Sequence, residues 1–211
     1  RQGTIRVLAI ILNSALFAHG GEDAVSSYGI INRVMMFANF PVLGMTQGFL
    51  PIAGYNYGAK KWLRVREVIF KSILYGTGLS LMIFTCILTF SDFLVGMFTT
   101  EEELISLSEP ALVLVFLATP LLTIQLIGSA YYQAIGKALP ALLLTLLKQG
   151  IFLIPLVLIL PLYFGLDGVW YSFPIADILT AIVNFFFIRK GIKTLSAYPI
   201  KPAVDDISQH K

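Results

Sequence analysis

Lys148 and Asp177 have the clearest potential for chemistry in this sequence, because each lies deep inside a long apolar stretch. Lys148 follows the turn 136–140 by about eight to eleven residues, roughly 12–16 Å along a helix. Asp177 is about ten residues from either end of its own stretch. An ionisable group at that depth is costly unless it is paired or lines a water-filled space. Asp177 could therefore carry a proton or form an ion pair with Lys148 or Arg33, and we favour the pair.

Further polar residues recur at helical spacing in the apolar stretches, so several of them share one face of each predicted helix. We expect these faces to surround a substrate cavity. The predicted lining consists of Arg33, Gln47, Gln125, Tyr132, Lys148, Asp177 and Asn184. Arg33 and Lys148 have a second interpretation, since each lies near enough to a membrane surface for its side chain to reach out to water.

Helical periodicity also predicts the neighbours of these residues. A regular α-helix places Ala141, Thr145, Phe152 and Pro155 on the same face as Lys148.

Small residues four positions apart predict close contact between helix backbones. Such spacing occurs at Gly44/Gly48, Gly54/Gly58 and Ser72/Gly76/Ser80. Asn13 and Asn39 are expected to form hydrogen bonds across helices.

The residue types needed for catalysis or metal binding are sparse. Cys86 is the only cysteine, and the two histidines, His19 and His210, lie at a loop edge and in a polar tail. No nucleophile–base pair and no metal-ligand spacing is present. The sequence therefore predicts neither an enzyme nor a resident cofactor or metal.

The composition indicates a protein that has lipid as its solvent. Hydrophobic residues make up 57% of the 211 residues and charged residues 13%, with a mean hydropathy of +0.82. About 20 apolar residues are needed per span, so the length accommodates six spans. We expect them at about 4–20, 24–57, 71–91, 108–135, 139–164 and 168–189, the second interrupted by Pro41 and Pro51. The predicted organisation is an all-α, six-helix lobe over residues 1–195 and a polar cytoplasmic tail over 196–211.

Charge is unevenly distributed among the connections. The segment 58–67, the turn 136–140 and the end of the last span carry the basic residues, whereas the other three connections carry acidic residues and no Lys or Arg. Cytoplasmic loops are enriched in Lys and Arg. A six-span zigzag then places both chain ends in the cytoplasm, and the basic loop 58–67 reports topology and not binding to nucleic acid.

Two segments resemble the multidrug and toxic compound extrusion (MATE) transporters. One is Gly48-Phe-Leu-Pro-Ile-Ala-Gly-Tyr-Asn-Tyr-Gly-Ala-Lys-Lys61, and the other is Gly128-Ser-Ala-Tyr-Tyr-Gln-Ala-Ile-Gly-Lys-Ala-Leu-Pro140. The resemblance implies the C-terminal lobe of a two-lobe transporter in the lipid bilayer, most simply a bacterial inner membrane, with the N-terminal lobe as its partner. It further implies export of small organic, often cationic compounds in exchange for H⁺ or Na⁺. Some family members carry a cation-binding carboxylate near Gly128, and the absence of one here argues against a sodium site in this lobe.

Other functions remain open on the sequence alone. A lipid-linked oligosaccharide flippase of the same superfamily would need several cationic cavity residues, and only Lys148 and Arg33 are available. An integral membrane enzyme would need a cluster of His, Asp or Glu at a membrane face. A structural membrane scaffold would leave the polar faces unexplained.

Overall fold

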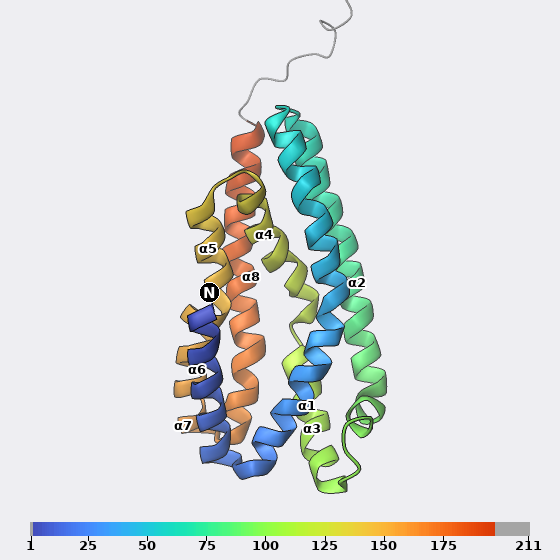
Figure 1. Cartoon of the computed structure of the whole chain (residues 1–211), viewed down its shortest axis with the longest axis vertical. Coiled ribbons are helices and arrows are strands. Elements are labelled where there is room, and N and C mark those ends of the chain that lie inside the picture. The colour runs from blue at the N-terminus through green and yellow to red at the C-terminus, as the bar shows by residue number, and fades with distance from the viewer. Residues whose placement is uncertain (1, 197–211) are drawn as a thin grey trace, which may run out of the picture.

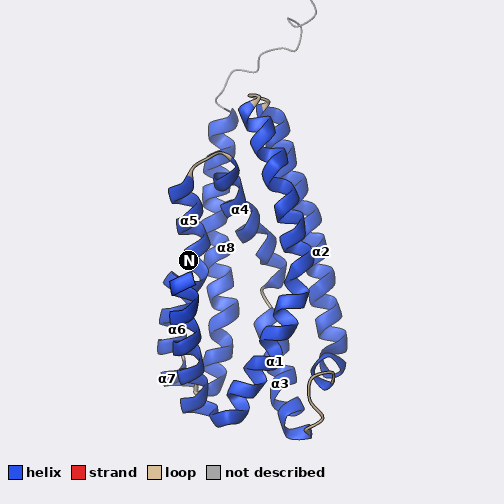
Figure 2. Cartoon of the chain, in the orientation of Figure 1, coloured by secondary structure: helices blue, strands red, loops and turns tan. Residues whose placement is uncertain are grey.

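The structure is a computed structural model that describes residues 2–196, and all of its regular elements in this range are helical (Figure 2). The predicted all-α class is therefore confirmed. The predicted tail 196–211 lies outside the described residues except for Ser196, which ends the last helix.

The helices run along one long axis (Figure 1). In chain order they are α1 (Gln2–Gly58), α2 (Trp62–Gly96), α3 (Glu102–Phe116), the 3-10 turn η1 (Thr119–Leu121), α4 (Leu122–Ala134), α5 (Ala138–Leu146), the π-helical η2 (Leu147–Leu153), α6 (Ile154–Ile159), α7 (Pro161–Phe164) and α8 (Leu166–Ser196).

Gly21 divides α1 into two rods. Its backbone angles, φ 66° and ψ −157°, are non-helical, and a positive φ favours glycine. The helical angles continue through Pro41 and Pro51, so the interruption predicted at these prolines is wrong. Proline in a helix removes one backbone hydrogen bond, and packing against α2 and α4 keeps this part of α1 continuous.

Four helical stretches are long and apolar enough to cross a membrane: Trp62–Gly96, Glu102–Ala134, Ala138–Phe164 and Leu166–Leu195. They agree with the last four predicted spans, with somewhat extended ends. The two rods of α1 are not among them, so the count of six spans stays a prediction.

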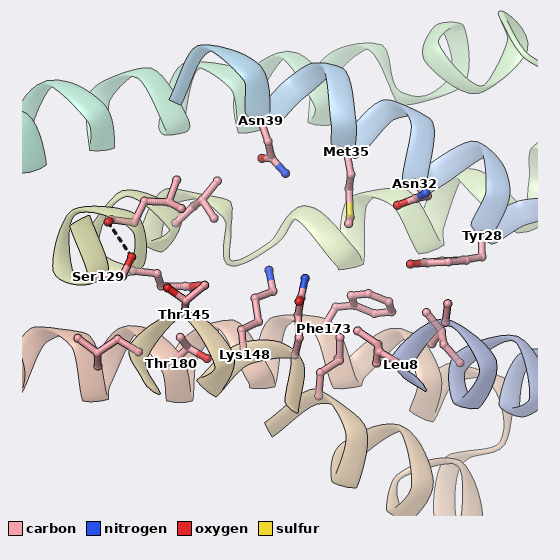
Figure 3. Close-up of a pocket in the computed structure, with 18 of the residues that line it drawn as sticks. Leu8, Tyr28, Asn32, Met35, Asn39, Ser129, Thr145, Lys148, Phe173 and Thr180 are labelled. Atoms are coloured by element: carbon pink, nitrogen blue, oxygen red, sulfur yellow. Dashed lines mark hydrogen bonds between the residues drawn. The ribbon is translucent and has the colours of Figure 1, made fainter. Parts of the chain in front are cut away.

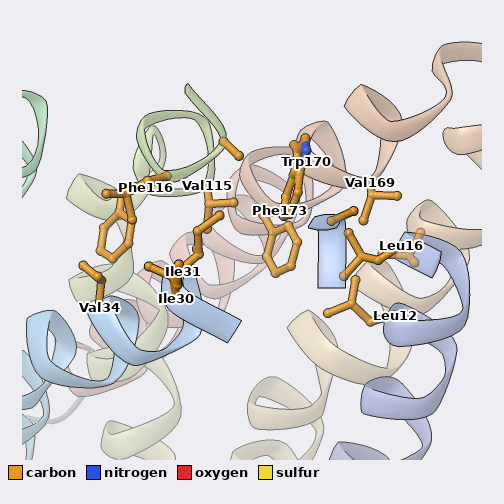
Figure 4. Packing of buried hydrophobic residues seen from close by; sticks show 14 of the residues in the cluster. Leu12, Leu16, Ile30, Ile31, Val34, Val115, Phe116, Val169, Trp170 and Phe173 are labelled. Carbon is orange, nitrogen blue, oxygen red and sulfur yellow. The ribbon is translucent and has the colours of Figure 1, made fainter. Parts of the chain in front are cut away.

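Two apolar clusters form the core of the bundle. The first includes Leu16, Phe116 and Phe173 (Figure 4), and the second includes Ile69 and Ile127. On α8 the first cluster ends at Ala176, and the fully buried part of the second begins at Ile188. Buried polar residues lie between the clusters along the chain, and we call them the polar layer: Thr119, Thr123, Gln125, Asp177, Thr180 and Asn184.

The two ends of the bundle differ in charge. The α1–α2 turn, the α4–α5 connection and the end of α8 lie toward the same end of the bundle in Figure 1, and these segments carry Lys60, Lys61, Lys137, Arg189 and Lys190. The α2–α3 connection at the opposite end is acidic. The charge separation read from the sequence is therefore a separation in space.

Close packing between α2 and α4 depends on the small residues predicted there. A Cβ atom on Gly76 would lie 2.5 Å from Cγ2 of Thr123, and the hydroxyls of Ser80 and Thr123 are hydrogen-bonded at 3.0 Å. Gly44 and Gly48 instead face open space, so the packing predicted for that pair does not occur among the described residues.

We predict that Gly76→Ala destabilises the chain by about 1–3 kcal/mol, because the added methyl group would overlap the side chains of Thr123 on α4 and Met45 on α1, and both would have to move. Gly78→Ala is the matched control, since Gly78 is exposed on the same helix and a methyl group added there would meet open space. Thermal unfolding in detergent measures both. Equal stability of the two variants would show that the α2–α4 contact is looser than the structure has it.

Candidate functional site

An ion pair joins η2 to α8 in the middle of the bundle. Nζ of Lys148 lies 2.6 Å from Oδ1 of Asp177, and Nε2 of Gln125 on α4 donates to the same oxygen and to the backbone oxygen of Asp177, both at 3.0 Å. The Lys148 side chain is 28% exposed and the Asp177 side chain 9%. Three helical segments therefore meet at one carboxylate. The favoured ion pair of Asp177 is confirmed, and of its two predicted partners, Lys148 and Arg33, the structure selects Lys148.

The turn that carries Lys148 is wider than an α-helix. Residues 147–153 form the π-helical segment η2, a conformation that is rare and frequent at functional sites. Pro155 lies two residues after the end of η2, and proline clashes with the carbonyl four residues before it, here that of Ile151. The wide turn therefore has a local explanation in the sequence, because it moves the carbonyl of Ile151 away from the ring of Pro155.

The π turn corrects the face predicted for Lys148. After it the buried residues are Leu153 and Val157, whereas Phe152 is half-buried and Pro155 is exposed. The prediction that Phe152 and Pro155 share the face of Lys148 is therefore wrong. It assumed a regular α-helix, whereas the i→i+5 hydrogen bonds of the π turn rotate every later side chain around the helix axis.

A cavity of about 510 Å³ lies beside the ion pair (Figure 3). The second rod of α1 forms one wall, and the opposite wall includes η2, α8 and the first rod of α1, which carries Leu8. Residues of α4 and α5 complete the lining. Its volume falls in the range of small-molecule sites. Polar residues form much of its lining: Asn13, Tyr28, Asn32, Asn39, Gln125, Ser129, Thr145, Lys148, Gln149 and Thr180. Lys148 is the only charged residue among those that line it.

The structure brings three of the predicted site residues together here. Gln125 and Lys148 line the cavity. Asp177 lines a smaller hollow of about 20 Å³, which Lys148 and Asn39 also line. These residues form the candidate site.

Two other predicted residues lie deeper or farther along the bundle. The hydroxyl of Tyr132 donates to the backbone oxygen of Phe187 at 2.9 Å and lines a separate cavity of about 190 Å³ at the basic end. Asn184 is fully buried, donates from Nδ2 to the backbone oxygen of Thr180 at 2.9 Å, and packs its Oδ1 against Gly128. Neither residue lines the cavity beside the ion pair.

Arg33 and Gln47 lie on an exposed face of α1 and do not line this cavity. The face of α1 that does line it carries Tyr28, Asn32, Met35 and Asn39. Both faces repeat every three or four residues, so helical periodicity does not say which one points inward. The two asparagines at a seven-residue spacing are the sequence signal that would have found it.

The described part of the chain does not meet the requirements of a metal site. Among residues 2–196, no group of three or more His, Cys, Asp or Glu side chains is placed to hold a metal ion. The chemistry of the site is therefore that of one ion pair surrounded by amides and hydroxyls.

The amino-acid sequence matches the family model MatE over residues 5–159, and the chain belongs to this family. It is 30% identical over 180 residues to the multidrug export protein MepA of Staphylococcus aureus. That match covers 85% of this chain and 39% of MepA, so the chain spans about two fifths of the length of this relative.

Solved transporter structures share the fold. One is an outward-facing multidrug resistance MATE family transporter of the MOP superfamily, with a TM-score of 0.87 and 24% identity. Another is a MOP superfamily transporter from Pyrococcus furiosus Vc1, with a TM-score of 0.87 and 25% identity. Each match covers 93% of this chain and 45% of the other chain. With its membrane-length helices, the chain is an integral membrane protein built as part of a MATE-type fold.

We predict that Lys148→Met destabilises the chain by about 3 kcal/mol, because it leaves Asp177 as a buried, unpaired charge. The double variant Lys148→Met with Asp177→Asn removes both charges and keeps an oxygen that accepts from Gln125, so most of the lost stability should return. Chemical or thermal unfolding in detergent compares the three proteins. If Lys148→Met alone matches the parent, the ion pair has no role in holding η2 against α8.

Proposed function

We propose that this chain is one lobe of a two-lobe multidrug exporter, with six membrane spans and an N-terminal lobe as its partner. The name of its relative MepA, a multidrug export protein, and the shared fold support this assignment. The two rods of α1, added to the four apolar membrane-length helices, would supply the six spans. Export of organic compounds would be driven by H⁺ or Na⁺ entering the cell.

The observation that carries the proposal is the polar cavity inside a lipid-embedded bundle. A helix bundle that serves only as a scaffold gains nothing from a space of about 510 Å³ lined by amides, hydroxyls and a lysine. Polar groups in membrane helices typically face a water-filled cavity and mark a pathway for substrates or ions. A transporter needs such a space, so export is the function that the site supports best.

The flippase alternative is less well supported. Binding a pyrophosphate calls for several cationic side chains, whereas Lys148 is the only one among the residues that line the cavity. An integral membrane enzyme would need a reactive cluster, and none of the cavity-lining residues is a histidine, cysteine or carboxylate.

Transport is expected only from the complete, two-lobe protein, because this lobe alone would leave one side of its cavity open to lipid. Drug efflux from vesicles with an imposed H⁺ or Na⁺ gradient measures it. Circular dichroism of the 211-residue chain in the same vesicles controls for folding. Ion-driven flux by the folded chain alone would contradict the half-transporter assignment, and no flux by the folded complete protein with any drug would contradict export.

We place the basic end of the bundle in the cytoplasm. In a Cys86→Ser background, Glu102→Cys should react with a membrane-impermeant maleimide in intact bacteria, and Lys61→Cys should react only after the cells are permeabilised. Both positions are exposed, so access to the thiol is set by the side of the membrane. Labelling of Lys61→Cys in intact cells would reverse the assigned orientation.

A further inference from the structure

The charges beside the cavity differ in how far a ligand can reach them. Lys148 lines the cavity and is 28% exposed, whereas Asp177 is 9% exposed and lines only the hollow of about 20 Å³. That hollow has room for about one water molecule. An organic ligand in the large cavity can therefore contact the ammonium group of Lys148. It is too large to enter the small hollow and reach the carboxylate of Asp177.

Lys148 has hydrogen-bonding capacity left for a ligand. A lysine ammonium group carries three N–H donors. Its one ion-pair partner among the described residues is Asp177, which takes a single donor at 2.6 Å. Asp177 thus holds the lysine in place, and the remaining donors are free for an anionic oxygen.

The rest of the lining suits an acidic group as well. The amides of Asn32, Asn39 and Gln149 can donate N–H groups, and no residue of the cavity lining carries a negative charge that would repel an anion. Figure 3 shows Lys148 reaching from η2 toward Asn39 and Met35 on the opposite wall. Phe173 and Met35 supply apolar surface for the body of an organic molecule.

We propose that this cavity binds organic anions or zwitterions through their acidic group, a carboxylate or sulfonate, with Lys148 as the counter-charge. The proposal rests on the assignment of the chain to an exporter and names the substrate class of that site. An organic cation is disfavoured there, because it would face the ammonium of Lys148 while Asp177 stays covered.

Two probes that share a naphthalene ring and carry opposite charges test the inference: naphthalene-2-sulfonate and 2-naphthyltrimethylammonium. Their binding to the 211-residue chain is measured by titration calorimetry in nanodiscs of zwitterionic lipid, so that the membrane surface adds no net charge. The sulfonate should bind at least about tenfold more tightly, as expected for a hydrogen bond to a charged group. Lys148→Arg should retain the preference.

The charge-free variant, Lys148→Met with Asp177→Asn, should lose the preference while remaining folded. Lys71→Met is the matched control, because Lys71 lies on α2 in an exposed pair with Glu67 and does not line the cavity. The inference is overturned if the probes bind equally, if the ammonium probe binds more tightly, if neither binds to folded protein, or if the preference survives in the charge-free variant.

Transport by the complete protein separates this inference from the proposed function. Export of cations alone, at parental rates in the charge-free variant, would leave the exporter assignment intact and refute the anion site. Absence of all export, with the sulfonate preference still present in binding, would refute the exporter assignment and leave the anion site standing.

Discussion

The contact between Lys148 and Asp177 is the constraint on which the centre of this bundle depends. It lies at the polar layer between the two apolar clusters, where Asp177 is buried and would be an expensive charge without a partner. Because Asp177 also accepts from Gln125, one carboxylate ties α4, η2 and α8 together. The helices around the cavity are thus held by polar contacts at its level and by apolar packing above and below it.

This arrangement explains how an open space survives in a packed bundle. Apolar residues on either side of the polar layer, such as Phe116 and Ile127, pack the helices together in two separate clusters. The small residues where α2 meets α4 bring those two helices close together. The side formed by α1 and η2 is left with amides and hydroxyls that pack less densely and leave room for a ligand.

Much of the site could be predicted from the sequence, because a charge deep in an apolar stretch must find a partner. That rule predicted an ion pair at Asp177 and limited its partner to Lys148 or Arg33, and the charge distribution predicted the two ends of the bundle. The choice of face on α1 could not be predicted: the stripe with Arg33 and the stripe with Asn32 have the same period, and only tertiary packing distinguishes them. The break at Gly21 falls in the gap predicted between the spans 4–20 and 24–57, whereas the continuity of α1 through Pro41 and Pro51 depends on the helices that pack against it.

The π-helical turn η2 changes which face of the continuous helix α5–η2–α6 points into the bundle. Before the turn the inward residues are Leu144 and Lys148, and after it they are Leu153 and Val157, so the step across the turn is longer than an α-helix allows. One surplus residue in a helix of about 3.6 residues per turn offsets the two halves by about 100°. The helix can therefore point Lys148 inward before the turn and Leu153 and Val157 inward after it. A regular α-helix would not place these residues on one face, because their spacing in the sequence does not fit its period.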